Sequence, residues 1–152
     1  MANRKSIRLK GWDYSSLGAY HVTICTKSKE KLFGDVADGH MVLSALGTCC
    51  LEAISDVHEE TDCFVIDSYV VMPNHVHLLI SIEQGSLQLG RIVANIKSRV
   101  TRLARIDHPG IQIWQRGYYD HIIRGERDYL DTIAYIEDNP RKWDEDRLYT
   151  GR

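Results

Sequence analysis

The sequence has no long apolar segment. No stretch of its 152 residues approaches the ~20 consecutive apolar residues that a membrane-spanning helix needs. The first residues, MANRKSIRLKGWDYSS, are basic but contain no apolar core, so we do not expect them to act as a secretory signal. These two absences favour a cytoplasmic protein that has no membrane partner.

Cysteine is also scarce, and its spacing excludes the common zinc motifs. The four cysteines are Cys25, Cys49, Cys50 and Cys63, and no two of them form a Cys-x-x-Cys pair. Two adjacent cysteines, as at 49 and 50, are poorly placed to bind one zinc ion. Three of the four lie in apolar surroundings, which predicts buried and reduced thiols rather than disulfides or a metal cluster.

An excess of positive charge is missing, although positive charge is unevenly distributed. The formal net charge is −2, which alone argues against a nucleic-acid-binding protein. Residues 1–31 and 86–127 are nevertheless rich in Lys and Arg, whereas residues 32–85 contain nine acidic residues and no Lys or Arg. Two basic segments could form one basic face, or they could belong to ordinary solvated helix surfaces.

The chain shows no internal repeat, low-complexity tract or linker, which predicts one domain over residues 1–152. Hydrophobic periodicity predicts strands at 19–26, 62–72 and 75–82 and helices at 40–60, 86–106 and 126–139. A short strand is expected within 113–124, and Pro140 is expected to end the last helix. The order β-α-β-β-α-β-α predicts an α+β fold in which helices flank an antiparallel sheet.

Two histidines interrupt the most apolar strand, in YVVMPNHVHLLIS at residues 69–81. Side chains two residues apart on a strand point to the same face, so His75 and His77 should project together. Such a pair could bind one divalent metal ion, or it could be a hydrogen-bonded pair on an edge strand. A metal site also needs a further ligand from elsewhere in the chain.

The last helix carries candidates for the remaining groups. Tyr135 and Asn139 are four residues apart and therefore share one helix face. A helical projection places Leu130, Ile133 and Ala134 on the apolar side and Asp128, Asp131, Thr132, Tyr135 and Asn139 opposite them. The pattern would present a phenol and an amide oxygen together, but a half-buried Tyr and a helix-end Asn before proline are also common in ordinary helices.

Three segments in this order resemble the single-tyrosine HUH transposases of the insertion sequence 200/605 family and their REP-associated relatives. They are YVVMPNHVHLLI, IWQRGYYDHIIR and YIEDNPRKW, and YHVTICTKSKEKLFG resembles the first strand of that family. The resemblance covers roughly residues 8–143. It implies the HUH fold, a ferredoxin- or RRM-like sandwich, and an endonuclease and strand transferase that acts on single-stranded or hairpin DNA.

The resemblance also implies roles for particular residues. His75 and His77 would bind a metal ion, Tyr135 would be the nucleophile, and Asn139 stands where the family has its third ligand. The cofactor would be Mg²⁺ or Mn²⁺, and imidazole nitrogens suit Mn²⁺ better. Attack by Tyr135 would leave a 5′-phosphotyrosine that a DNA 3′-hydroxyl can resolve without ATP. Tyr135 needs activation by the metal or by a base, for which His121 and Asp131 are candidates.

The basic segments are the expected phosphate contacts. The residues concerned are Arg4, Lys5, Arg8, Lys10, Arg91, Lys97, Arg99, Arg102, Arg105 and Arg116. Trp12, Tyr14 and Tyr118 could stack on bases, whereas Trp114 and Tyr119 are expected to pack in the core. Family members often dimerise through their sheets, with the tyrosine helix serving the partner, and Gly125 offers a hinge for such an exchange. We therefore predict a homodimer.

Two other functions compete with this interpretation. A domesticated, non-mobile protein could keep the fold for binding or processing REP-type DNA, although His75, His77, Tyr135 and Asn139 are all present. A hydrolase that uses a histidine nucleophile in a His-x-His-x-His motif is disfavoured, because the third alternate position is Leu79.

Overall fold

The computed structural model describes residues 18–82 and 89–145, together with Leu148. The strands are β1 (Gly18–Cys25), β2 (Gly34–Ala37), β3 (His40–Leu43), β4 (Phe64–Met72), β5 (His75–Ile82) and β6 (Tyr119–Ile122). The helices are α2 (Ala45–Glu59), α3 (Leu89–Asp107) and α4 (Glu126–Asp138), with short 3₁₀ segments η2 (Lys27–Lys29) and η3 (Pro140–Glu145). Among the described residues, no helix is both long and apolar enough to cross a membrane.

The main sheet has the strand order β4-β5-β1-β6, and every neighbouring pair is antiparallel. Met72 pairs with His75, so Pro73 and Asn74 form the tight turn between β4 and β5. This confirms the predicted hairpin, and the strand β5 begins and ends where the sequence placed it. Because β5 has a neighbour on each side, its histidines do not lie on an edge strand.

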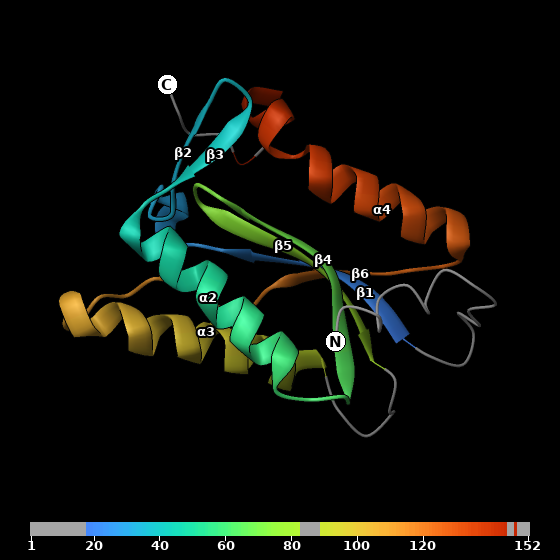
Figure 1. The fold of residues 1–152 in the computed structure, drawn as a ribbon, viewed down its shortest axis with the longest axis horizontal. Helices are drawn as coiled ribbons and strands as arrows, with labels where there is room; N and C mark the ends of the chain where they lie inside the picture. The colour runs from blue at the N-terminus through green and yellow to red at the C-terminus, as the bar shows by residue number, and fades with distance from the viewer. Residues whose placement is uncertain (1–17, 83–88, 146–147, 149–152) are drawn as a thin grey trace.

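Helices α2 and α3 lie together on one face of this sheet, and α4 lies on the opposite face (Figure 1). The predicted antiparallel sheet flanked by helices is therefore confirmed. The face under α2 and α3 holds the larger apolar core. Alternate residues of β5 enter it, namely Val76, Leu78, Ile80 and Ile82, and meet the buried stripe of α3.

The opposite face holds a second and smaller apolar cluster under α4. It consists of Ala19, Leu79, Ile123, Tyr129 and Ile136. The predicted orientation of α4 is wrong, because Leu130 is 43% exposed and Ala134 is exposed, whereas Thr132 and Asn139 are buried. The large ring of Tyr129 fills the space against the sheet, and this turns Leu130 towards solvent.

A hairpin of two short strands, β2 and β3, was not predicted. The expected helix over 40–60 begins only at Ala45, since Ser44 caps it by accepting a hydrogen bond from the Gly47 backbone. The turn between the strands contains Asp38 and Gly39, both with positive φ. An Asp-Gly pair at these dihedrals is typical of a two-residue hairpin turn, so the sequence did contain a signal for it.

Strand β6 lies at the edge of the sheet and all of its side chains are exposed. Tyr119 is 56% exposed, so the expectation that it packs in the core is wrong. Trp114 does pack against the core, with its ring 5.4 Å from that of Phe33, and its Nε1 donates to the Lys97 carbonyl. The four cysteines form no disulfide, and Cys25 and Cys50 are buried whereas Cys63 is exposed.

Candidate active site

Strand β5 presents His75 and His77 to the face of the sheet that α4 covers. The rings lie 4.8 Å apart between centroids in an edge-to-face arrangement, and both side chains are buried. Their neighbours in sequence point into the core on the other side. The period-two alternation of a strand therefore brings two imidazoles together at the cost of desolvating both.

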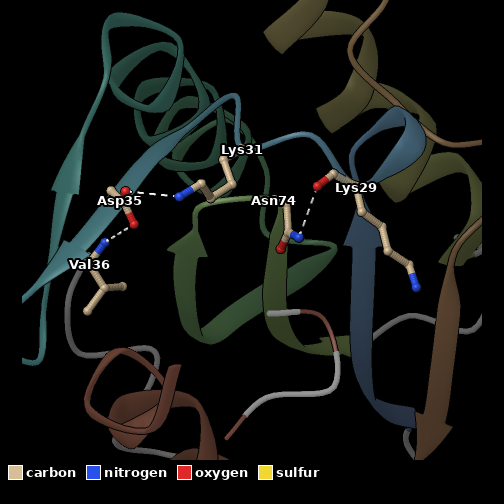
Figure 2. Close-up of polar contacts among 5 residues, drawn as sticks. All are labelled: Lys29, Lys31, Asp35, Val36 and Asn74. Atoms are coloured by element: carbon tan, nitrogen blue, oxygen red, sulfur yellow. Dashed lines mark hydrogen bonds and ion pairs between the residues drawn. The ribbon is translucent and has the colours of Figure 1, made fainter. Parts of the chain in front are cut away.

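Asn74 and Trp143 surround His75. The Asn74 Oδ1 atom lies 2.8 Å from His75 Nδ1, and because an amide oxygen only accepts, His75 donates this hydrogen bond. The Asn74 amide nitrogen donates to the carbonyls of Lys29 and Leu148, and Figure 2 shows the first of these contacts. Trp143 stacks on His75 with ring centroids 6.1 Å apart. Asn74 thus ties His75 to the loop after β1 and to the C-terminal segment.

The loop that Asn74 reaches is itself braced. Lys31 makes a 3.0 Å ion pair with Asp35, whose other carboxylate oxygen accepts from the Val36 backbone nitrogen (Figure 2). The hydrogen bond from Lys31 lowers the pKa of Asp35, and the Val36 backbone N–H adds to the effect. These exposed contacts join the end of the loop to the start of β2.

The Nδ1 atom of His77 contacts two residues of β1. It lies 3.1 Å from His21 Nε2 and 3.1 Å from Thr23 Oγ1. The Nδ1 atoms of His75 and His77 both make hydrogen bonds. A metal ion would therefore bind the Nε2 atom of each ring. In known metal sites, a histidine that binds the metal through one ring nitrogen usually makes a hydrogen bond through the other, and this hydrogen bond orients the ring.

Tyr135 reaches the same place from α4. Its side chain is 50% exposed, and its ring lies 5.3 Å from that of His77 and 5.7 Å from that of His21. The tyrosine lines a pocket of about 910 Å³ together with His21, Thr23, His77, Asp131 and Asn139. The structure thus brings Tyr135 to the histidine pair within one chain.

Asn139 follows directly after the last residue of α4 and is buried. Its Nδ2 donates to the Tyr135 carbonyl at 3.2 Å, but its Oδ1 accepts no hydrogen bond from any residue that the structure describes. A buried carbonyl oxygen without a donor costs about 1–3 kcal/mol. An oxygen of this kind, on a residue that lines the same pocket as His77, fits a site for a cation.

The donor set fits a divalent metal ion. In the described parts of the chain, no three His, Cys, Asp or Glu side chains form a metal-binding group, so a third protein ligand beside His75 and His77 would be of another type, such as the amide oxygen of Asn139. Two nitrogens and one oxygen suit Mn²⁺ better than Mg²⁺, which prefers oxygen alone.

The titratable neighbours of the pocket have shifted pKa values. Burial lowers the pKa of His21, and nearby His121 lowers it further, whereas Asp128 opposes this. Desolvation alone would raise the pKa of Asp128, but hydrogen bonds from the Arg124 N–H and from His121 prevail and lower it. His121 is thereby held by Asp128 at 2.9 Å. Of the two proposed bases, Asp131 lines the pocket and His121 does not.

Among the described residues, the basic side chains that the sequence suggested for DNA do not line this pocket. Helix α3, which carries most of them, is on the opposite face of the sheet (Figure 1). Several of its cations bind other parts of the chain. Lys97 donates to the carbonyls of Gln115 and Gly117, Arg105 donates to that of Ile111, and Arg99 pairs with Glu60. Arg91, Arg102 and Arg116 are exposed. Arg4, Lys5, Arg8 and Lys10, like Trp12 and Tyr14, lie outside the described residues.

The sequence predicted His75, His77, Tyr135 and Asn139 as site residues; the last three line the pocket, and His75 lies against His77. Sequence reasoning missed His21, Thr23, Asn74 and Trp143, which hold the two imidazoles. His21 and Thr23 alternate on β1 as the histidine pair does on β5, and this alternation was the available signal. The contacts of Asn74 and Trp143 depend on segments that are distant in sequence and could not be read from spacing.

An antiparallel sheet whose central strand presents His-x-His to a tyrosine on a covering helix defines the single-tyrosine HUH fold. The comparison with known families agrees. The model of the family described as "Transposase IS200 like" matches residues 14–139, which is most of the chain. The protein belongs to this family, the single-tyrosine transposases of the IS200/605 type.

Individual relatives support the same placement. An uncharacterized protein of Haemophilus influenzae is 38% identical over 168 residues, covering 97% of this chain and 93% of its own length. The REP-associated tyrosine transposase of Escherichia coli K12 is 30% identical over 79 residues, and the match spans 52% of this chain and 46% of that one. A solved REP-associated tyrosine transposase, bound to a REP hairpin, shares the fold with a TM-score of 0.64 at 24% identity, covering 82% of this chain and 67% of that one.

Proposed function

We propose that this transposase cuts and rejoins single-stranded or hairpin DNA through a 5′-phosphotyrosine on Tyr135. The observation that carries the proposal is that an exposed phenol, the His77 imidazole and an unsatisfied amide oxygen line one pocket, with the His75 ring in contact with that of His77. The chemistry of these groups matches a nucleophile beside a cation site. The family to which the chain belongs makes DNA the expected substrate.

In the proposed reaction, the Tyr135 oxygen forms a bond to the scissile phosphorus. The bond from phosphorus to the 3′ oxygen breaks, and this oxygen takes a proton from water and leaves as the DNA 3′-hydroxyl. The phenolic proton passes to a base, and Asp131 is placed for this role because it lines the pocket one helical turn before Tyr135. The 3′-hydroxyl of another strand reverses these bond changes and releases the enzyme.

His75, His77 and Asn139 would hold Mn²⁺ or Mg²⁺ in this scheme. When bound, such an ion polarises the scissile phosphate and offsets the charge that develops on it. Hydrogen bonds to Asn74, His21 and Thr23 orient the two imidazoles, and the hydrogen bond from Asn139 to the Tyr135 carbonyl would couple the third ligand to the nucleophile. The chain thus presents both parts of the site from elements that pack on one sheet face.

We also propose that the exposed cations Arg91, Arg102 and Arg116 contact DNA phosphates, together with Arg4, Lys5, Arg8 and Lys10. Because α3 lies on the sheet face opposite the pocket, Arg91 and Arg102 would bind a part of the DNA distant from the cleaved bond. The homodimer stays a prediction. Light scattering over a range of protein concentrations checks it, and a monomer at high concentration would contradict it.

The test of the proposed function is incubation of the full chain with labelled single-stranded DNA and Mn²⁺, followed by a denaturing gel. We expect a DNA–protein adduct for the wild type and none for Tyr135→Phe, which removes only the hydroxyl from a half-exposed ring. An equal adduct with Tyr135→Phe would move the nucleophile elsewhere. Exposed Tyr119 would then be the next candidate, because Tyr129 is only 1% exposed.

A further inference from the structure

His21 is a pocket residue to which the proposed reaction gives no role. It lies on β1, pairs with Leu79 of β5, and stands diagonally to His77 on the same face. Its ring centroid is 5.0 Å from that of His77, and its Nε2 lies 3.1 Å from His77 Nδ1. Its ring also contacts Tyr135. The residue therefore touches a candidate ligand and the candidate nucleophile at once.

The chemistry of imidazole sets a requirement at His77. A neutral imidazole carries one hydrogen on its two nitrogens, and a nitrogen that binds a metal must offer a lone pair. If Nε2 of His77 binds the ion, its hydrogen must lie on Nδ1, and a neighbour must accept it. Thr23 Oγ1 and His21 Nε2 are the two atoms at 3.1 Å that can do so.

His75 meets the same requirement in another way. The Asn74 amide oxygen can only accept, so it fixes the hydrogen of His75 on Nδ1. At the Nδ1 atom of His77, the two contacts are with His21 and Thr23. The orientation of His77 depends on a histidine and a threonine, each of which can accept or donate.

We propose that His21 is a positioning residue that accepts the Nδ1 hydrogen of His77 and so holds the His77 ring with Nε2 directed at a divalent cation, Thr23 sharing this contact. The inference rests on the proposed metal site. It assigns to β1 the role that Asn74 performs for His75, and the two ligands are then held by separate elements. Loss of a contact of this kind weakens metal binding by about 10–100-fold in other metal sites.

The test is a titration of the full chain with Mn²⁺ in the absence of DNA. The electron paramagnetic resonance signal of the free ion measures how much Mn²⁺ remains unbound. His21→Phe keeps a ring but removes the acceptor, and His21→Gln keeps an amide oxygen near the position of Nε2. We expect Kd to rise by about 10–100-fold in His21→Phe and to return most of the way to the wild-type value in His21→Gln. Thermal unfolding of each variant shows that it is folded.

The outcomes separate this inference from the proposed function. Wild-type binding no tighter than that of His75→Ala would remove the metal site itself. Tight wild-type binding that His21→Phe leaves unchanged would overturn only the role of His21. Equal weakening in His21→Phe and His21→Gln would also overturn it, because packing rather than hydrogen-bond acceptance would then be at work.

A second measurement needs no substitution of His21. In ¹⁵N-histidine-labelled wild-type protein with Mg²⁺, nitrogen–proton correlation spectra show which nitrogen of each ring carries the hydrogen, and His77→Ala identifies the His77 signals. We expect the hydrogen of His77 on Nδ1. A hydrogen on Nε2 would overturn the inference, even if His21→Phe does not fold.

Discussion

The two faces of the sheet bury different kinds of side chain, although the same strands form both. Under α2 and α3, β5 contributes only apolar residues to a large continuous core. Under α4, the same strand contributes His75, His77 and Ser81, and the helix adds buried Thr132 and Asn139. Neighbouring residues of β5 thus point to opposite faces, one with the large apolar core and the other with the candidate site.

The comparison teaches how a small chain supports a polar site. Burying imidazoles and amides is unfavourable unless they are hydrogen-bonded. The α4 face has a small apolar cluster of its own, so the larger core on the opposite face must supply most of the hydrophobic stabilisation. Substitutions on the two faces should therefore affect different measurements.

The largest expected effect is the contrast in Mn²⁺ binding between substitutions of two buried histidines, His77 on the α4 side of the sheet and His58 on the α2 side. His77→Ala should abolish Mn²⁺ binding and the DNA adduct, because it removes one of three ligands. His58 of α2 is the matched control, since its Nδ1 accepts a hydrogen bond from the Ile66 backbone at 3.2 Å. His58→Ala should lower the free energy of unfolding by about 1–3 kcal/mol and leave the Mn²⁺ affinity unchanged.

Chemical denaturation and the Mn²⁺ titration, applied to both variants, check this contrast. If His58→Ala weakened metal binding as much as His77→Ala, the two faces would not be separate in function. If His77→Ala still formed the DNA adduct, the predicted need for His77 in the reaction would be wrong.

The next effect tests which side of α4 is buried. Ile136 is fully buried against the sheet, and Leu130 is 43% exposed. Ile136→Ala should lower the free energy of unfolding by about 2–5 kcal/mol, whereas Leu130→Ala should change it by less than about 1 kcal/mol. Urea denaturation measures both, and a larger loss for Leu130→Ala would restore the helix orientation that the sequence suggested.

A smaller effect is expected where the chain enters α4. Gly125 has φ of 150° and ψ of 179°, a conformation that is essentially restricted to glycine. An added Cβ meets no atom within 4 Å there, so any loss comes from backbone strain alone. Gly125→Ala should lower the free energy of unfolding by about 1–3 kcal/mol. Gly110→Ala is a useful comparison, since Gly110 also has positive φ and open space but lies away from the α4 face.

The smallest effect is expected at Asp128, at the edge of the α4 face. Hydrogen bonds from Arg124 and His121 lower its pKa in the folded protein, despite desolvation. A carboxylate whose pKa is lowered stabilises the fold above its unfolded pKa of about 4, and this contribution is lost as the pH falls through the folded value. Asp128→Asn should therefore be less stable than the wild type near pH 5, by less than about 1 kcal/mol.

The difference between wild type and Asp128→Asn should shrink between about pH 5 and about pH 3, the range in which the carboxylate is protonated. Denaturation curves at both pH values measure it. A difference that stayed constant would mean that the charge of Asp128 contributes nothing and that the side chain acts only by its shape.

Features that depend on residues close together in the sequence could be predicted, whereas features that depend on contacts between distant segments could not. The alternation in β5 needs only local geometry, so it correctly placed His75 and His77 on one face. The exposure of Tyr135 was also predicted, although the apolar side of α4 was assigned wrongly. That assignment took Leu130 as the buried residue, whereas the space against Ala19 and Leu79 is filled by Tyr129.

Which residues contact the two imidazoles could not be predicted from local pattern alone, although the alternation of His21 and Thr23 on β1 was visible in the sequence. His21 contacts His77 only because β1 pairs with β5 in one register, and a strand shows its own alternation but not its neighbour. The contact between Asn74 and Leu148 joins residues that are 74 positions apart. Tertiary pairing, rather than local propensity, decides both.

The central claim is that Tyr135 is the residue that becomes linked to DNA. It is tested most directly by digesting the Mn²⁺-dependent adduct with a protease and locating the nucleotide by mass spectrometry. We predict a DNA 5′ end joined to Tyr135, in a peptide from α4. A nucleotide on Tyr119, on a histidine, or linked through its 3′ end would contradict the claim.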